Sequence, residues 1–367
     1  MPEVINNPIT GGGKLRSSNF ELYRILCMLV IVAHHFVVNS GFTSSDGSLT
    51  TSPTTLNSIF IWLFGMWGKT GINCFLLITG YFMCSSKITI RKFVKLLLWI
   101  YIYRIVIYAL FLYFGYETLS AVRIVKLAMP VWGFEANFIS CFIGFWLTIP
   151  FWNILIHNMT RKQHLILVAL LVGMYSCLGS IPTFRVTFNY VTWFGVIYLI
   201  ASYIRMYPHQ CFENKKLWVA VMVAAIILSI LSVIVLIFIG KGEYFFMSDS
   251  NKVFAVVVAV SSFISIKNIH IPYNKIINAI GGSTFGVLLI HANSDAMRQW
   301  LWKDCFDCVG HYNLTFLQFI GFSIGVVLTI FFSCILIDRI RKKIIEEPFF
   351  KWYDKKPRFS KLQSCLS

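Results

Sequence analysis

Residues 217–240 read LWVAVMVAAIILSILSVIVLIFIG, a run that contains no ionisable side chain. About 20 consecutive apolar residues form a helix long enough to cross the hydrocarbon core of a bilayer. The composition of the whole chain points the same way, because 57% of its 367 residues are hydrophobic and only 13% are charged. A water-soluble protein carries roughly 25% charged residues, since its surface must face water. These features exclude a soluble multidomain enzyme.

Similar apolar stretches recur along the chain and predict an all-α, polytopic integral membrane protein of about ten transmembrane helices. The second stretch is too long for one straight helix, and we expect it to break among Gly65, Gly68 and Gly71. The connections are short, so a single membrane domain is expected. The predicted spans are 20–41, 56–84, 93–115, 138–157, 164–181, 188–204, 217–240, 252–267, 277–297 and 315–337.

Lysine and arginine are divided unevenly between the alternate connections of these spans. The set that includes both chain ends carries 22 of them and the other set carries seven. By the positive-inside rule the richer side is cytoplasmic. We therefore predict a disordered cytoplasmic N-terminus (1–18), a transmembrane domain (19–340) and a basic cytoplasmic tail (341–367), in the inner (cytoplasmic) membrane. The seven Lys and Arg residues in the other set of connections are Arg123, Lys126, Arg185, Lys241, Lys252, Arg298 and Lys303.

The net charge of +17 lies at helix ends and in the tail, which favours contact with anionic lipid head groups over nucleic acid. No nucleic-acid partner is expected. One outer loop, WKDCFDCVGH, brings Cys305, Cys308 and His311 close in sequence. A single CxxC without a second pair is not the pattern of a structural zinc site, so no metal is predicted; a disulfide or two free thiols fits better.

The first span contains ionisable residues, which cost roughly 2.5–3.5 kcal/mol each inside a bilayer. Arg24 and His35 are eleven positions apart, which places them about 20° apart around a helix and about 16 Å apart along it. His34 points about 80° away from Arg24. Arg24 could simply reach the cytoplasmic interface beside Glu21. His35 lies well inside the span. Because histidine can take and return a proton near neutral pH, its position there suggests a catalytic role.

Polar residues also interrupt two later spans. In GINCFLLITGYF, Asn73 and Thr79 stand among apolar residues, and the buried amide of Asn73 needs a partner. In GGSTFGVLLIHAN, Ser283 precedes His291 by eight positions, about 80° around a helix, so the two do not form a nucleophile pair. His291 is either a hydrogen-bonding residue between helices or part of a site.

Four segments together resemble the bacterial acyltransferase-type-three family of integral membrane O-acyltransferases. They run in the family's order over residues 21–350, on a chain of similar length and span number. The sequence departs from the family pattern at Thr79, where serine is usual, at Asn73, where an acid is frequent, and at Leu288, where tyrosine is frequent. The matching positions are Arg24 and His35; Gly71, Phe75, Thr79 and Gly80; the run from Ser283 to His291; and Glu346, Pro348 and Phe349.

The resemblance implies transfer of a small acyl group, usually acetyl, from cytoplasmic acyl-CoA to a hydroxyl of a cell-surface or envelope glycan. This reaction is an O-acetylation that modifies a polysaccharide or a lipid-linked sugar, with acyl-CoA as co-substrate and no bound cofactor. Arg24 suits the head group of the donor, and His35 either deprotonates the acceptor hydroxyl or carries the acyl group. The expected substrate-binding residues are Asn73, Thr79, Ser283 and His291.

Two other functions fit a polytopic chain. A secondary transporter could use the intramembrane Arg24 and His35 as substrate or proton-relay groups, but neither an inverted repeat nor a chain of intramembrane acids is evident. A non-catalytic membrane scaffold would not need Arg24 and His35 on one helix face. The acyltransferase is therefore the preferred prediction, with the transporter as the alternative.

Overall fold

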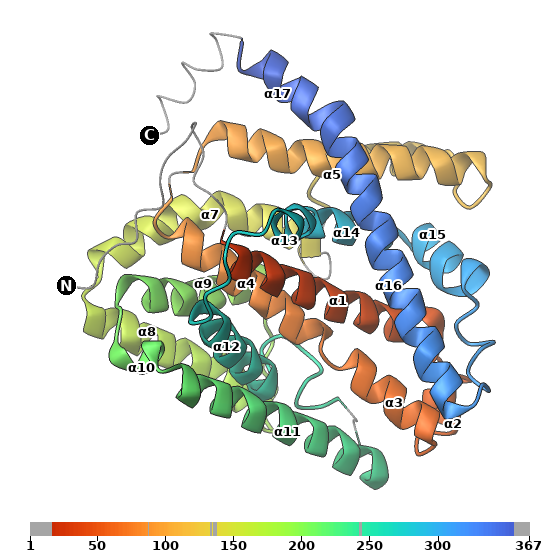
Figure 1. Ribbon diagram of the computed structural model, residues 1–367, viewed down its shortest axis with the longest axis horizontal. Coiled ribbons are helices and arrows are strands. Elements are labelled where there is room, and N and C mark those ends of the chain that lie inside the picture. The colour runs from red at the N-terminus through yellow and green to blue at the C-terminus, as the bar shows by residue number, and fades with distance from the viewer. Residues whose placement is uncertain (1–16, 87, 133, 135–137, 242–243, 356–367) are drawn as a thin grey trace.

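The computed structural model describes residues 17–355 except 87, 133, 135–137 and 242–243, and all regular elements among them are helical (Figure 1). Most of the N-terminal segment predicted to be disordered lies outside these residues, as does the end of the tail. The membrane helices and their extensions are α1 (Ser18–Ser40), α3 (Leu56–Gly65), α4 (Gly68–Met83), α5 (Ile90–Tyr113), α7 (Phe138–Asn158), α8 (Arg161–Val172), η1 (Gly173–Cys177), η2 (Leu178–Ser180), α9 (Tyr190–Met206), α11 (Lys215–Ile239), α12 (Val253–Lys267), α13 (Lys275–Gly281), α14 (Thr284–His291), α16 (Phe316–Arg341), η4 (Lys342–Glu346) and α17 (Glu347–Tyr353). The connecting helices are α2 (Ser48–Thr51), α6 (Ala121–Ala128), α10 (Gln210–Glu213), α15 (Asp295–Arg298) and η3 (Gln299–Cys305).

Each of the ten predicted spans coincides with a helix or a broken helix. In the described part of the chain, seven helical segments are long and apolar enough to cross a membrane. The pair Lys275–His291 and Asp295–Cys305, bent by 97°, makes an eighth if it is one span. The helices α9 and α12 have only 17 and 15 residues. The count of ten spans and the cytoplasmic position of both ends therefore stay predictions.

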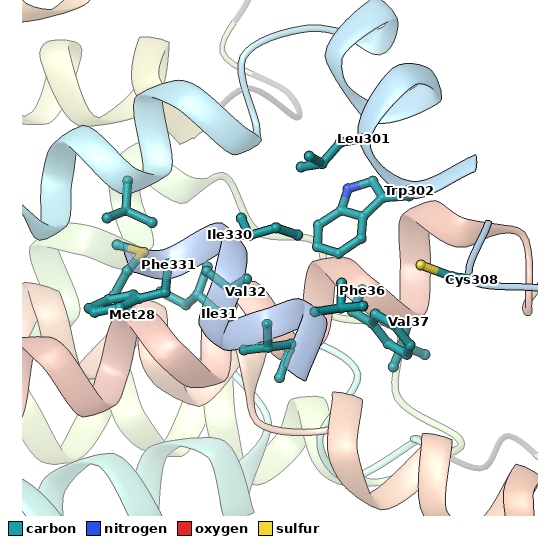
Figure 2. Packing of buried hydrophobic residues seen from close by; sticks show 14 of the residues in the cluster. Met28, Ile31, Val32, Phe36, Val37, Leu301, Trp302, Cys308, Ile330 and Phe331 are labelled. Atoms are coloured by element: carbon teal, nitrogen blue, oxygen red, sulfur yellow. The ribbon is translucent and has the colours of Figure 1, made fainter. Parts of the chain in front are cut away.

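The first helix, α1, lies in the middle of the bundle, where it contacts α3, α4, α12, α13, α14 and α16. One side of α1 packs with Ile31 and Phe36 against Phe331 of α16 and Trp302 of η3 (Figure 2). Its N-terminal half packs with Tyr23 into a second cluster around α4 and α9. Because lipid is as apolar as these side chains, close packing rather than escape from water holds such helices together. Arg24 and His35 are thus held on a closely packed central helix.

The second span breaks between Gly65 and Gly68, within the glycine triplet expected from the sequence. A Cβ atom on Gly68 would lie 2.2 Å from Cγ of His34, so only glycine lets α4 approach α1 this closely. The carbonyl of Gly65 accepts a hydrogen bond from Nδ1 of His34 at 2.7 Å. The imidazole of His34 therefore has a structural role, which is to bind backbone at a helix break.

Candidate active site

Two histidines from distant parts of the sequence meet inside the bundle. Nδ1 of His35 on α1 lies 2.8 Å from Nε2 of His291 at the end of α14. His291 is completely buried, and its own Nδ1 lies 2.6 Å from the carbonyl oxygen of Val287, one turn earlier on α14. The two imidazoles form a chain that ends on a backbone carbonyl.

The tautomers of this pair follow from its partners. A carbonyl can only accept, so Nδ1 of His291 carries a proton. In neutral His291, Nε2 is then an acceptor, and Nδ1 of His35 donates to it. This leaves Nε2 of His35 as the unprotonated nitrogen, and no described residue forms a hydrogen bond with it. The pair therefore presents a base at His35, oriented by His291 as the aspartate orients histidine in a catalytic triad.

His35 faces a cavity of about 800 Å³. Arg24 and Thr79 line the same cavity, whereas His34 does not. The wall between them is mostly apolar, with Ile31 and Trp99 among its residues. A cavity of this size, with few polar groups in an apolar wall, is typical of a small-molecule site.

The four predicted substrate-binding residues take different positions. Thr79 lines the cavity, although its hydroxyl donates to the carbonyl of Phe75. His291 lies behind His35 rather than in the cavity wall. Ser283, buried at the start of α14, and Asn73 are also outside the wall. The roles assigned to these residues from the sequence stay predictions.

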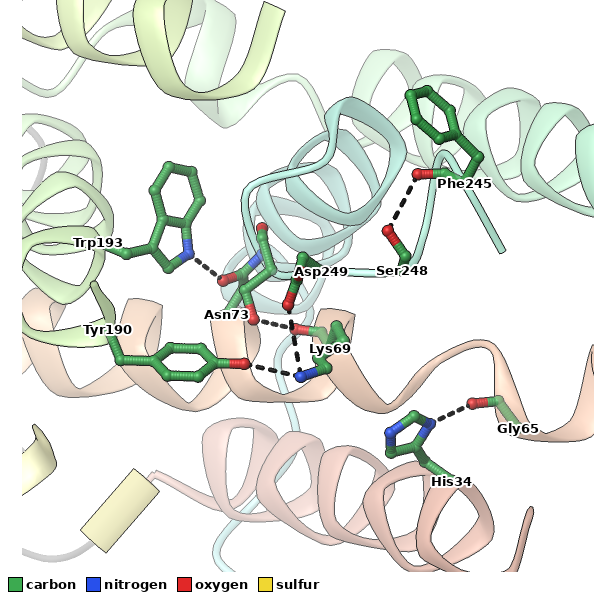
Figure 3. A network of polar contacts seen from close by, with 10 residues as sticks. His34, Gly65, Lys69, Asn73, Tyr190, Trp193, Phe245, Ser248 and Asp249 are labelled. Carbon is green, nitrogen blue, oxygen red and sulfur yellow. Dashed lines mark hydrogen bonds and ion pairs between the residues drawn. The ribbon is translucent and has the colours of Figure 1, made fainter. Parts of the chain in front are cut away.

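Asn73 forms a fully buried link between three elements (Figure 3). Its amide nitrogen donates to the carbonyl of Ser250 at 2.7 Å, and its carbonyl oxygen accepts from the indole of Trp193 at 2.9 Å. The amide that was expected to need a partner thus ties α4 to α9 and to the segment before α12.

The same two elements carry the partners of Lys69. Its ammonium donates to the hydroxyl of Tyr190 at 2.7 Å and lies 3.5 Å from a carboxylate oxygen of Asp249 (Figure 3). All three residues line the cavity. Asn73 forms its hydrogen bonds with Ser250, the residue after Asp249, and with Trp193, one turn after Tyr190. It therefore holds both partners of Lys69 in place.

A buried ionic cluster lies beside another part of the cavity wall, where α5 begins and α16 ends. Arg341 lies 2.9 Å from Asp338 and 3.0 Å from Glu346, and all three are almost fully buried. Glu346 also contacts Lys95 at 2.6 Å and accepts from the indole of Trp99 at 2.6 Å. Lys95 and Trp99 line the cavity, and Glu346 of the C-terminal motif holds both of these side chains in position.

The charges inside the spans converge on this cavity. Of the 32 Lys and Arg residues, three lie at least four residues inside a predicted span: Arg24, Lys69 and Arg104. All three line the cavity. The sequence signal for Lys69 and Arg104 is the same as for Arg24, an ionisable side chain within an apolar stretch.

The two cysteines of the predicted outer loop differ in exposure. Cys305 is exposed and Cys308 is buried, and both are free thiols. Within the described residues, no group of three His, Cys, Asp or Glu side chains could hold a metal ion.

A family model for an acyltransferase domain, of the acyltransferase-3 type, matches residues 18–338. This match runs from the start of α1 into the last turn of α16 and includes His35, His291 and the residues that line the cavity. No curated protein and no solved structure matches the chain significantly. The comparison confirms the family resemblance and gives no support to a transporter. The chain belongs to the acyltransferase-3 family and is a membrane acyltransferase.

Proposed function

We propose that this enzyme transfers an acyl group from cytoplasmic acyl-CoA to a hydroxyl of a cell-surface or envelope glycan. The acyl group that we propose first is acetyl. The observation that supports the proposal is the contact between His35 and His291 beside a cavity whose described wall carries six cationic side chains. In this proposal the donor and the acceptor approach His35 from opposite sides of the membrane. The family match supports the reaction type.

The donor end is the one that carries Arg24, Lys92 and Lys95. Lys92 and Lys95 lie in the first two turns of α5, and the distribution of Lys and Arg predicts that this end of α5 faces the cytoplasm. Arg24 lies 3.2 Å from Glu21 and still lines the cavity. Coenzyme A carries several phosphate groups, and arginine and lysine are the side chains that bind phosphate. The apolar wall beyond them suits the uncharged arm that carries the thioester.

The chemistry at His35 follows from its tautomer. Nε2 accepts the proton of the acceptor hydroxyl while the hydroxyl oxygen attacks the thioester carbonyl carbon. The carbon–sulfur bond then breaks, and the CoA sulfur leaves with the electron pair and receives the proton from His35. His291 accepts a hydrogen bond from Nδ1 throughout, which stabilises the imidazolium that forms on His35.

A comparison of cells with and without the gene tests the function. NMR and mass spectrometry of the envelope glycans should show an O-acyl group that is present only when the gene is present. Identical O-acyl content in both would contradict the proposal.

A second experiment separates the two possible roles of His35. Purified protein is mixed with acetyl-CoA in the absence of acceptor, and the peptide that contains His35 is analysed by mass spectrometry. If His35 is a base, the peptide stays unmodified; if His35 carries the acyl group, the peptide gains the mass of an acetyl group.

A further inference from the structure

The half of the cavity away from the donor end is also positively charged. Within the described residues, six cationic side chains line the cavity, and Asp249 is the only carboxylate in the wall. Three of the cations belong to the donor end. The other three are Lys69, Arg104 and Arg298.

Arg104 has no carboxylate partner in the part of the chain that the structure describes. It lies in the middle of α5, and Nη1 donates to the carbonyl of Met129 at 2.8 Å. Guanidinium has five N–H donors, so one backbone bond leaves most of its capacity unused. A charged group inside a span is costly and is usually retained for a substrate or for a partner charge.

Lys69 and Arg298 line the same cavity as His35. Each has an acidic neighbour that leaves it accessible: Asp249 is 3.5 Å from Lys69, and Asp295, which pairs with Arg298, is largely exposed.

We propose that the acceptor is an anionic glycan. Its carboxylate or phosphate lies on the sugar that carries the reacting hydroxyl or on the neighbouring sugar. This inference rests on the proposed function and names its acceptor class. Arg104 and Arg298 bind the anionic group, and Lys69 with its partners Tyr190 and Asp249 orients the sugar hydroxyls.

The first experiment locates the transferred acyl group. Glycans from cells with the wild-type chain and with His35→Ala are compared by proton, carbon and phosphorus NMR and by mass spectrometry. The O-acyl group lost in His35→Ala is expected on an acidic or phosphorylated sugar, or on its direct neighbour, and the spectra distinguish carboxylate from phosphate. An acyl group found only on glycans without charge would overturn the anionic acceptor and leave the proposed function intact. No difference between the strains would remove the proposed function itself, and this inference with it.

The second experiment changes the cations at matched protein levels. Arg104→Gln keeps a donor for the Met129 carbonyl but loses the charge, and Arg298→Gln loses the charge at the end of α15. Each should reduce glycan O-acyl content at least tenfold without changing the KM for acetyl-CoA. Arg104→Lys should recover part of it. Arg185→Gln is the matched control, because Arg185 is an exposed arginine of the outer set that does not line the cavity. Full acylation by Arg104→Gln and Arg298→Gln, equal to that of Arg185→Gln, would contradict the inference.

Discussion

Nδ1 of His35 lies 2.8 Å from Nε2 of His291, although 256 positions separate the two residues in the sequence. The contact joins the central helix α1 to α14, and the carbonyl of Val287 fixes its direction by requiring a proton on Nδ1 of His291. We therefore expect His35 to meet the substrate and His291 to position it.

Replacing His291 should reduce turnover without weakening donor binding. His291→Ala removes the acceptor for Nδ1 of His35, and we expect kcat to fall roughly 10²-fold or more, within the range for a positioned acid–base group, with the KM for acyl-CoA nearly unchanged. His291→Gln keeps a side-chain acceptor and should recover part of kcat. Steady-state kinetics on purified enzyme check this. A role in folding alone would instead lower the amount of inserted protein and leave the kcat of the remainder intact.

Arg24 should serve the donor. Arg24→Ala is expected to raise the KM for acyl-CoA about tenfold or more, because the phosphates lose a guanidinium partner. Arg24→Lys should recover this only in part, since an ammonium lacks the planar fork of arginine. Lys162→Ala is the control: it removes a positive charge from the predicted cytoplasmic side at an exposed residue outside the cavity wall. An unchanged KM in Arg24→Ala would show that the donor does not bind there.

The buried ionic cluster should support stability. Arg341→Ala leaves Asp338 and Glu346 without their common partner, and breaking such a buried network typically costs about 3–5 kcal/mol. Thermal unfolding followed by tryptophan fluorescence should show a clearly lower Tm. Arg339→Ala, two residues earlier on α16 and exposed, should change the Tm little. Equal Tm values for the two variants would be inconsistent with this role.

The topology can be tested with reporter fusions. The excess of lysine and arginine in one set of connections predicts a cytoplasmic C-terminus. A reporter that works only in the cytoplasm should be active when fused after residue 367, and one that works only outside should be inactive there. The reverse pattern would show that the orientation is wrong.

The helices were predictable because the bilayer restricts which sequences can cross it. Runs such as 217–240 have few alternatives to a spanning helix, and the break in the second span follows from its length and its glycines. The short, deeply buried helices α9 and α12 fall below the usual length for a span, so sequence and structure do not together fix the number of crossings.

The candidate site was predictable only where it lies on one helix. Helical periodicity relates Arg24 to His35 and separates His34 from them. Nothing local relates His35 to His291, because their contact depends on how α1 packs against α14. Asn73 illustrates the same limit: a buried amide is visible in the sequence, but its partners on α9 and beside α12 are tertiary.

The central claim is that His35, and not its neighbour His34, carries the reaction. The measurement is glycan O-acyl content in cells that express wild type, His35→Ala or His34→Gln at matched membrane levels. His34→Gln keeps a side-chain donor for the carbonyl of Gly65. The account predicts that His35→Ala abolishes acylation, a loss of roughly 10²–10⁴-fold, while His34→Gln retains most of it. An active His35→Ala enzyme beside an inactive His34→Gln enzyme would contradict the site and the mechanism built on it.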